Sequence, residues 1–276
     1  MEIHPFKNDR IQLSVDKISF KNPYDFFKVH RHSYYEIFLF EKGCGGVQMI
    51  DFDECNIEDK TLFIVSPNQV HLLKRMARED GILLQFTMDY LETSIHLVDP
   101  NILFTLRENT FTQLNDSDFN KLLFLFQQLR EIYDSNDSYR QEKLQHFFAF
   151  TIFHVLDVLQ KTNLQPVKDN LCLQFQKLAE NNFKNNRNIS FYAEQLNVSK
   201  NKLSAQVNAN LGITPLQYLH ELLKVEIRRL VLIEQLSHKE ISHFLGFDSQ
   251  SSYSRFVKKK LGCNPRELSR SFQIHK

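Results

Sequence analysis

Glycine is scarce in this chain, with seven residues among 276. Their positions form neither a GxGxxG nor a GxxxxGK spacing, which excludes the glycine-rich phosphate loops of the common nucleotide-dependent enzymes. No apolar run approaches the roughly 20 residues that a membrane-spanning helix needs, and the first residues lack the pattern of a secretion signal. The four cysteines stand apart without a CxxC pair. We therefore expect a reduced, cytoplasmic protein with no membrane partner.

Charge is divided unequally between the two halves of the chain. Residues 171–276 carry 16 Lys and Arg against 8 Asp and Glu, whereas residues 1–170 carry 18 against 25. The C-terminal half is therefore basic and the N-terminal half acidic. A basic region favours a polyanionic partner, because Lys and Arg that neutralise phosphates release condensed counterions. This makes the C-terminal half the candidate for nucleic-acid binding.

The C-terminal half contains an internal repeat. One copy begins at Ala193 and the other at Ser242. The shared landmarks are an apolar–glycine pair and a following proline, at Leu211, Gly212 and Pro215 in the first copy and at Leu261, Gly262 and Pro265 in the second. In each copy the apolar spacing predicts two short helices around a tight turn, which Gly246 supplies in the second. This is the anatomy of a helix-turn-helix unit.

Capping residues support these predicted helices. Ser199 is a candidate N-cap in the first unit, and Ser237 with Glu240 predicts a capping box that opens the second. Thr214, which is followed by proline, predicts the start of a connecting helix that the apolar pattern carries to about Leu236. Roughly 20 residues at about 1.5 Å each span about 30 Å, which is close to the ~34 Å pitch of DNA. Two recognition helices at its ends can then enter successive major grooves.

The outer faces of the second helices carry polar residues of the kinds that reach base edges and phosphates. The predicted DNA-contacting residues are Lys200, Asn201, Lys202 and Ser204 in the first unit, and Gln250, Ser251, Ser252, Arg255 and Lys259 in the second. Arg255 has core positions on both sides, and arginine is the side chain best matched to guanine, so we expect it to read a base. Lys259 belongs to a lysine run that we expect to face phosphates.

At these residues the chain resembles the AraC/XylS family of bacterial transcription regulators. The most specific stretch is residues 241–265, with a Gly-Phe turn, an aromatic-x-Arg-Phe core and a closing Gly-x-x-Pro. The resemblance covers residues 171–276 and implies a DNA-binding domain with two helix-turn-helix units. The chain departs from the family at Leu222, Ser269 and Ala205, where basic residues are common. We therefore expect the first unit to read bases more weakly than the second.

The acidic half begins with short alternating segments that predict β-strands, followed by two amphipathic helices. The predicted strands cover residues 11–15, 36–40, 46–50, 61–66 and 81–88, with turns at 42–46, 51–56 and 67–68. The predicted helices cover residues 116–133 and 140–160, and residues 161–170 form the predicted linker. The expected fold class is α+β in two domains: an antiparallel cupin-like jelly roll with following helices, then an all-α domain with two helix-turn-helix units.

Histidines and a glutamate within the predicted strands are similar to cupin motifs. His30, His32 and Glu36 match the first motif, and Pro67 to His71 resembles the second. With a period of two, the first three share one strand face and can converge with His71, which gives the ligand composition of non-haem iron sites. The alternative is a set of polar groups in an effector pocket. We favour the pocket, with no metal and no cofactor, because the family resemblance implies mostly organic effectors and the second motif lacks its usual glycine.

We expect residues 1–165 to form a cupin-like effector-binding and dimerisation domain, and residues 166–276 an AraC-type DNA-binding domain. The chain is then a sequence-specific transcription regulator and not an enzyme, with double-stranded promoter DNA, a small-molecule effector and RNA polymerase as expected partners. The alternative function is a cupin-type metal-dependent oxygenase or isomerase. A DNA-repair protein would need an activated cysteine, and the sequence shows none. A homodimer is expected because the two predicted helices carry more apolar residues than one buried face needs: Phe119, Leu122, Leu123, Phe126, Phe147, Phe148 and Ile152.

Overall fold

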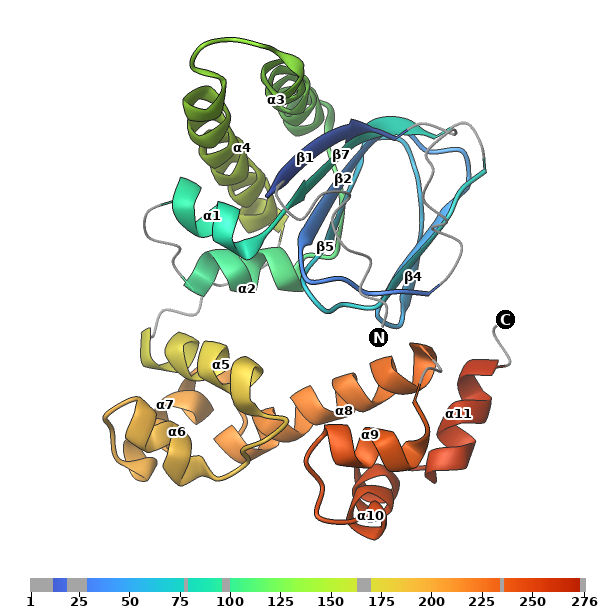
Figure 1. Cartoon of the computed structure of the whole chain (residues 1–276), viewed down its shortest axis with the longest axis vertical. Coiled ribbons are helices and arrows are strands. Elements are labelled where there is room, and N and C mark those ends of the chain that lie inside the picture. The colour runs from blue at the N-terminus through green and yellow to red at the C-terminus, as the bar shows by residue number, and fades with distance from the viewer. Residues whose placement is uncertain are drawn as a thin grey trace. The chain divides into compact units, whose positions relative to one another are not determined.

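The computed structural model of the protein describes residues 12–18, 29–76, 79–95, 100–162, 170–233 and 236–273. The chain separates into two compact units, Met1–Pro166 and Val167–Lys276, whose elements are labelled in Figure 1. Most of the predicted linker, at residues 163–169, lies outside the described residues. In the described ranges, no helix combines the length and the apolar character that crossing a bilayer requires.

Two antiparallel sheets form the β part of the N-terminal unit. The larger sheet has the strand order β1-β7-β2-β5-β8, and the smaller has the order β4-β3-β6. The strands are β1 (Leu13–Lys17), β2 (Tyr35–Lys42), β3 (Val47–Ile50), β4 (Asp53–Asn56), β5 (Thr61–Val65), β6 (His71–Lys74), β7 (Asp80–Phe86) and β8 (Phe111–Gln113). The predicted antiparallel β domain is confirmed.

The larger sheet is buried on both faces. On one face of β2, Phe38 and Phe40 share a core with Ile50 and Leu73 of the smaller sheet. On the other face, Ile37 belongs to a core that includes the helices of the unit. Side chains alternate along a strand, so β2 needs apolar residues in both registers. The interior between the two sheets therefore has its own core, separate from the one beneath the helices.

The helices of the N-terminal unit are α1 (Met88–Ser94), α2 (Pro100–Glu108), α3 (Asp116–Asp134) and α4 (Arg140–Thr162). The long helices α3 and α4 lie side by side and confirm the two predicted helices (Figure 1). The sequence did not predict α1, α2, β6 or β8. The predicted turn at 51–56 is partly wrong: the chain turns at Asp51 and β4 begins at Asp53.

The apolar residues that we expected to be in excess on the two long helices lie in the core of the unit. Phe119, Leu122, Phe126, Phe148 and Ile152 are buried, and Leu123 and Phe147 pack against them. The helices α1 and α2 and the larger sheet contact these faces, so our reason for expecting a dimer was wrong. The exposed aromatic side chains of α3 and α4 are Phe124, Phe150 and Phe153, which are 58%, 51% and 48% exposed.

The described C-terminal unit is entirely helical, as predicted. Its helices are α5 (Asn170–Asn182), α6 (Ile189–Gln195), α7 (Lys200–Leu211), α8 (Pro215–Ile233), α9 (His238–Phe244), α10 (Gln250–Leu261) and α11 (Pro265–Gln273). They share one apolar core, to which Leu203 of α7 and Val257 of α10 both belong. Each predicted recognition helix is thus anchored by its inner face.

The predicted helix starts are confirmed by hydrogen bonds. Ser199 caps α7, and Ser237 with Glu240 forms the capping box of α9. Thr214 N–H donates to Gln217 Oε1 at 2.8 Å, and Gln217 N–H donates to Thr214 Oγ1 at 3.2 Å, which closes a second capping box at α8. The described part of the predicted connecting helix is α8, from Pro215 to Ile233, and residues 234–235 lie outside the described residues.

Candidate functional site

Both helix-turn-helix units contain the same tight turn. In each, a backbone N–H donates to the carbonyl five residues earlier: Val198 to Ala193 at 2.9 Å, and Phe247 to Ser242 at 3.0 Å. The residue before each donor has a left-handed backbone, with φ of 54° at Asn197 and 60° at Gly246. Asparagine and glycine adopt this conformation most readily. The internal repeat of the sequence is therefore a repeat of backbone geometry.

The connecting helix α8 sets the spacing of the two units. Its 19 residues span about 28 Å at about 1.5 Å per residue. Figure 1 shows α8 running from the group formed by α6 and α7 to the group formed by α9, α10 and α11. A spacing of this size suits two helices that enter successive major grooves on one side of a duplex.

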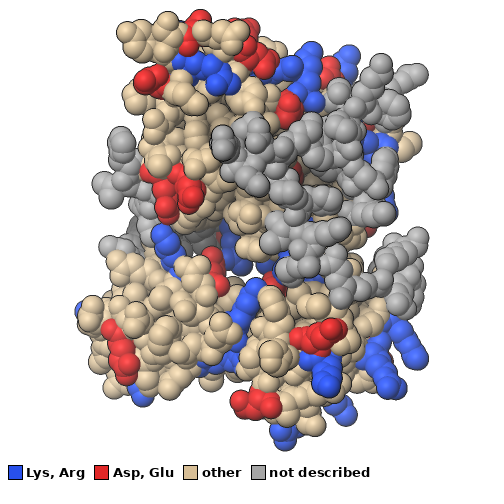
Figure 2. Space-filling model, viewed as in Figure 1, with Lys and Arg blue, Asp and Glu red and all other residues tan. Residues whose placement is uncertain are grey.

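The structure places most of the predicted DNA-contacting residues on the surface. The exposed ones are Lys200, Asn201 and Lys202 on α7, and Gln250, Ser251, Arg255 and Lys259 on α10, whereas Ser204 and Ser252 are half-buried. Figure 2 shows Lys and Arg side chains projecting from the lower edge of the C-terminal unit, with some acidic side chains among them. The charge of this unit is therefore carried at its surface.

Hydrogen bonds within α10 orient two of these residues. Ser252 N–H donates to Ser249 Oγ at 3.1 Å, which caps the helix. Arg255 Nη2 lies 3.4 Å from Ser252 Oγ, so the guanidinium lies near the N-terminal end of the recognition helix. Helices of this kind present their N-terminal residues to base edges. Ser252 Oγ thus helps to position the Arg255 guanidinium, a role that the sequence pattern did not reveal.

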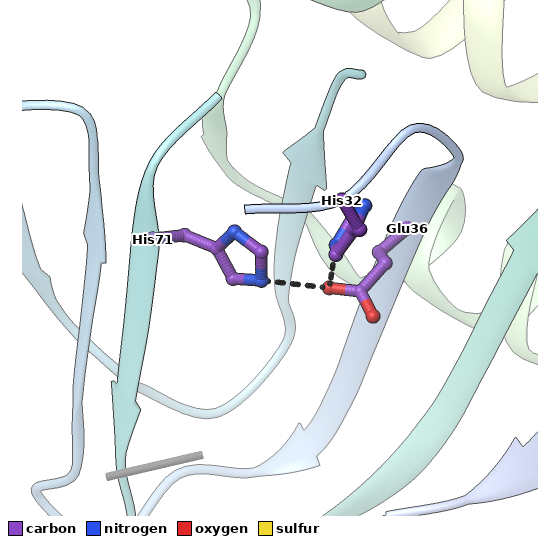
Figure 3. A group of neighbouring side chains, drawn as sticks. All are labelled: His32, Glu36 and His71. Carbon is purple, nitrogen blue, oxygen red and sulfur yellow. Dashed lines mark ion pairs between the residues drawn. The ribbon is translucent and has the colours of Figure 1, made fainter. Parts of the chain in front are cut away.

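A second candidate site lies inside the N-terminal unit. His32, Glu36 and His71 are buried there and each offers one atom to a group whose members lie within 4.8 Å of one another. Glu36 Oε2 lies 3.2 Å from His32 Nε2 and 3.3 Å from His71 Nε2. Figure 3 shows both imidazoles directed at this carboxylate oxygen, with Glu36 on β2 and His71 on β6. The structure thus joins three of the four motif residues.

The other ring nitrogens of the two histidines face backbone carbonyls. His32 Nδ1 lies 2.9 Å from the Tyr34 carbonyl oxygen, and His71 Nδ1 lies 3.3 Å from the Gln69 carbonyl oxygen. A carbonyl oxygen only accepts hydrogen bonds, so each Nδ1 carries the proton. In a neutral imidazole the Nε2 atom then has a free lone pair. The Nε2 atom of each ring points at Glu36, as a lone pair when the ring is neutral and as an N–H donor when it is protonated.

Burial and the interactions among the three residues act in opposite directions on ionisation in this cluster. Burial lowers the pKa of His32 below its usual value, although the neighbouring Glu36 charge opposes this. Burial also raises the pKa of Glu36, but the charges and hydrogen bonding of the two imidazoles outweigh it and hold the pKa well below the usual range. The favoured state is a carboxylate beside a neutral His32.

The fourth motif residue, His30, lies beside the cluster and not in the group of three. Its ring centroid is 4.1 Å from that of His71 and 6.2 Å from that of His32. We expected one continuous strand face to carry His30, His32 and Glu36, and this was wrong because β2 begins only at Tyr35. Instead, a bridge between the backbones of His30 and His71 brings the two motifs together.

Two buried glutamines complete the site and were not found from the sequence. Gln85 Nε2 donates to Glu36 Oε1 at 2.7 Å. Gln48 is 1% exposed, and among the residues that the structure describes neither polar atom of its side chain has a hydrogen-bond partner. In the β3–β6 register Gln48 lies opposite Leu73, two positions from His71, so both side chains face the interior between the sheets. The signal in the sequence was a glutamine on a predicted strand. This signal does not show whether the side chain lies on the inner or the outer face of the sheet.

Family models match most of the chain. Residues 12–148 match a model described as an AraC-like ligand binding domain, and residues 192–271 match one described as a helix-turn-helix domain. The buried histidine–glutamate cluster lies in the first match, and both helix-turn-helix turns lie in the second.

Two known proteins resemble the chain over most of its length, and a third resembles about a third of it. The HTH-type transcriptional activator RhaS of Escherichia coli (strain SMS-3-5 / SECEC) is 22% identical over 250 residues, which cover 88% of this chain and 87% of RhaS. ToxT from Vibrio cholerae strain SCE256, solved with an unsaturated fatty acid bound, is 15% identical over 93% of this chain and 94% of its own, with a TM-score of 0.43. The C-terminal domain of AraT, a response regulator from Geobacillus stearothermophilus, is 26% identical over 37% of this chain and 86% of its own, with a TM-score of 0.36.

Proposed function

The chain belongs to the AraC family of transcriptional regulators, and on this basis we propose which of its parts perform each step of regulation. It is a DNA-binding regulator controlled by a small-molecule effector, with a ligand-binding domain followed by a helix-turn-helix domain. We assign effector binding and dimerisation to residues 1–165 and DNA binding to residues 166–276. The observation that carries this proposal is the pair of equivalent turns at the two ends of α8.

We propose that α7 and α10 enter successive major grooves of one promoter. Base reading is assigned mainly to α10 through Arg255 and Gln250, with Ser251 and Ser252 beside them. Lys200, Asn201, Lys202 and Ser204 of α7 give the weaker first contact, and Lys259 binds phosphate. The exposure of these side chains, apart from the half-buried Ser204 and Ser252, supports this assignment.

We propose that the chain forms a homodimer through the exposed aromatic side chains of α4. Phe150 and Phe153 are three residues apart, which places them on one helix face, and both are about half exposed. Replacing both with serine should shift the sedimentation of the full chain from dimer to monomer at micromolar concentration. Replacing the exposed Phe124 of α3 with serine gives a matched comparison. A wild-type chain that sediments as a monomer contradicts the proposal.

The alternative of a cupin-type oxygenase or isomerase is not favoured. The match of the C-terminal unit to a DNA-binding domain, and the regulatory function of RhaS, support a regulator.

We also propose that the protein acts in the cytoplasm, where it meets promoter DNA and RNA polymerase.

The proposed function is tested by sequencing the DNA fragments that the purified chain selects from a random pool, with and without cell metabolites. The expected result is a bipartite site with half-sites about one helical turn apart, whose enrichment changes with metabolites. Selection of no common sequence overturns the proposal.

A further inference from the structure

The buried cluster of His32, Glu36 and His71 has an unsatisfied arrangement of lone pairs. His32 Nε2 and His71 Nε2 are buried and lie 3.2 and 3.3 Å from the buried Glu36 Oε2, and apart from one another these three atoms have no hydrogen-bond partner among the described residues. Both Nδ1 atoms face backbone carbonyls, so the protons of neutral imidazoles lie on the far side of each ring. When both rings are neutral, three electron-pair donors converge on one point with no hydrogen between them. Buried polar atoms are rarely left in this state.

We propose that these three atoms bind one divalent first-row transition-metal ion, such as Zn²⁺ or Fe²⁺. Two imidazole nitrogens and one carboxylate oxygen are donors that such ions prefer, whereas Mg²⁺ and Ca²⁺ prefer oxygen ligands alone. The ion sits between the donors and replaces their mutual repulsion with attraction. This inference names the class of ligand that the effector-binding domain takes. It rests on the proposed function only in assigning effector binding to this domain.

Residues around the cluster already orient its donors in the way that metal sites require. Ligating histidines commonly donate their second ring N–H to a backbone carbonyl, as His32 does to Tyr34 and His71 to Gln69. Gln85 holds the second oxygen of Glu36 at 2.7 Å, which leaves Oε2 for the ion. These contacts fix the tautomers and the ring planes before any ion arrives.

The missing glycine of the second motif does not count against the site. The backbones of His30 and His71 exchange two hydrogen bonds, with His30 N–H to His71 oxygen at 3.1 Å and His71 N–H to His30 oxygen at 2.9 Å. This pairing positions His71 without a glycine beside it. Three protein donors leave at least one coordination position open, and the unpartnered amide of Gln48 faces the same interior.

The test uses the full chain, stripped with a chelator and then dialysed against Zn²⁺, Co²⁺ or Mg²⁺. Wild-type protein should retain about one Zn²⁺ or Co²⁺ per chain and no Mg²⁺. Glu36→Gln and His71→Gln should each weaken binding by more than about 100-fold, since even an outer partner of a ligand is worth 10- to 100-fold. His154→Gln on α4, whose ring contacts Phe150 outside the cluster, is the control and should bind like wild type.

Thermal unfolding separates loss of binding from loss of fold. In Glu36→Gln the new amide N–H can donate to an imidazole Nε2, so the metal-free variant should melt no lower than metal-free wild type, and added Zn²⁺ should raise the Tm of wild type alone.

The proposal is overturned if wild type binds no ion, if both variants bind as wild type does, or if metal-free Glu36→Gln unfolds. The last result would mean that a charged imidazole and Glu36 form a buried ion pair. DNA selection on the same samples distinguishes these failures from failure of the proposed function. A chain that selects a DNA site without binding metal overturns the metal-binding proposal and leaves the proposed function intact.

Discussion

The guanidinium carbon of Arg187 lies 4.4 Å from the ring centroid of Phe247, although 60 residues separate them. Arg187 lies in the segment between α5 and α6, and its Nη2 also donates to the carbonyl of Leu245 at the end of α9. The side chain therefore joins the segment that leads into the first helix-turn-helix unit to the turn of the second. We infer that this contact helps to fix the distance between the two recognition helices.

Arg187→Ala should lower the free energy of unfolding of the chain by about 1 to 3 kcal/mol, because the Leu245 carbonyl loses its side-chain donor and the Phe247 ring loses its cation. Urea unfolding followed by circular dichroism measures this change. The variant should also lose more affinity for a bipartite DNA site than for a single half-site. Equal losses on both sites would mean that Arg187 stabilises the fold without setting the spacing.

Gly246→Ala should be more destabilising than Gly212→Ala. Both glycines have a left-handed backbone, with φ of 60° and 68°, so alanine pays a similar conformational cost of about 1 to 2 kcal/mol at each. At Gly246, however, a Cβ atom would lie 2.6 Å from the Lys184 carbonyl oxygen, whereas at Gly212 it would meet no atom of the described residues within 4 Å. Urea unfolding of the two variants measures the difference, and equal losses would contradict the close approach.

Arg255→Ala should weaken binding to the best DNA site about ten- to hundred-fold, because a bidentate contact to guanine is worth about 1 to 3 kcal/mol. Binding to scrambled DNA should change less. Lys259→Ala, on the same helix, should weaken both complexes by a similar factor, since a phosphate contact carries no sequence information. Fluorescence anisotropy with both DNAs makes the comparison. If Arg255→Ala lowers both affinities equally, Arg255 binds phosphate.

The stability of the C-terminal unit should fall in mild acid because of His238. Burial lowers the pKa of this imidazole below its usual 6.5, and its nitrogens lie 3.0 Å from Tyr253 Oη and from Ser269 Oγ. The folded state therefore binds fewer protons than the unfolded state. The stabilisation is complete above pH 6.5 and is lost as the pH falls from there through the folded pKa.

Unfolding free energies of wild type and His238→Gln, measured between about pH 5 and 8, test this prediction. The difference between the two proteins should shrink as the pH falls. Burial also lowers the pKa of His220, and this contribution cancels because both proteins contain it. A difference that is independent of pH would assign His238 a purely structural role.

Much of the DNA-binding unit follows from local sequence. The caps at Ser199, Thr214 and Ser237 and the turn at Gly246 were all predicted correctly, because each depends on hydrogen bonds or backbone angles within a few residues. The charge difference between the halves and the internal repeat also required no folded structure.

Features that depend on strand register or on contacts between distant segments were not predictable in the same way. The sequence suggested that His30, His32 and Glu36 lie on one strand face, yet β2 starts at Tyr35. It is the backbone bridge between His30 and His71 that brings the two motifs together. Likewise, nothing local indicates that Arg187 reaches Phe247. Periodicity shows which residues share a face, but not what covers that face, because packing between elements distant in sequence decides it. This is why Phe126 is buried and Phe150 exposed, although both lie on apolar stretches of long helices.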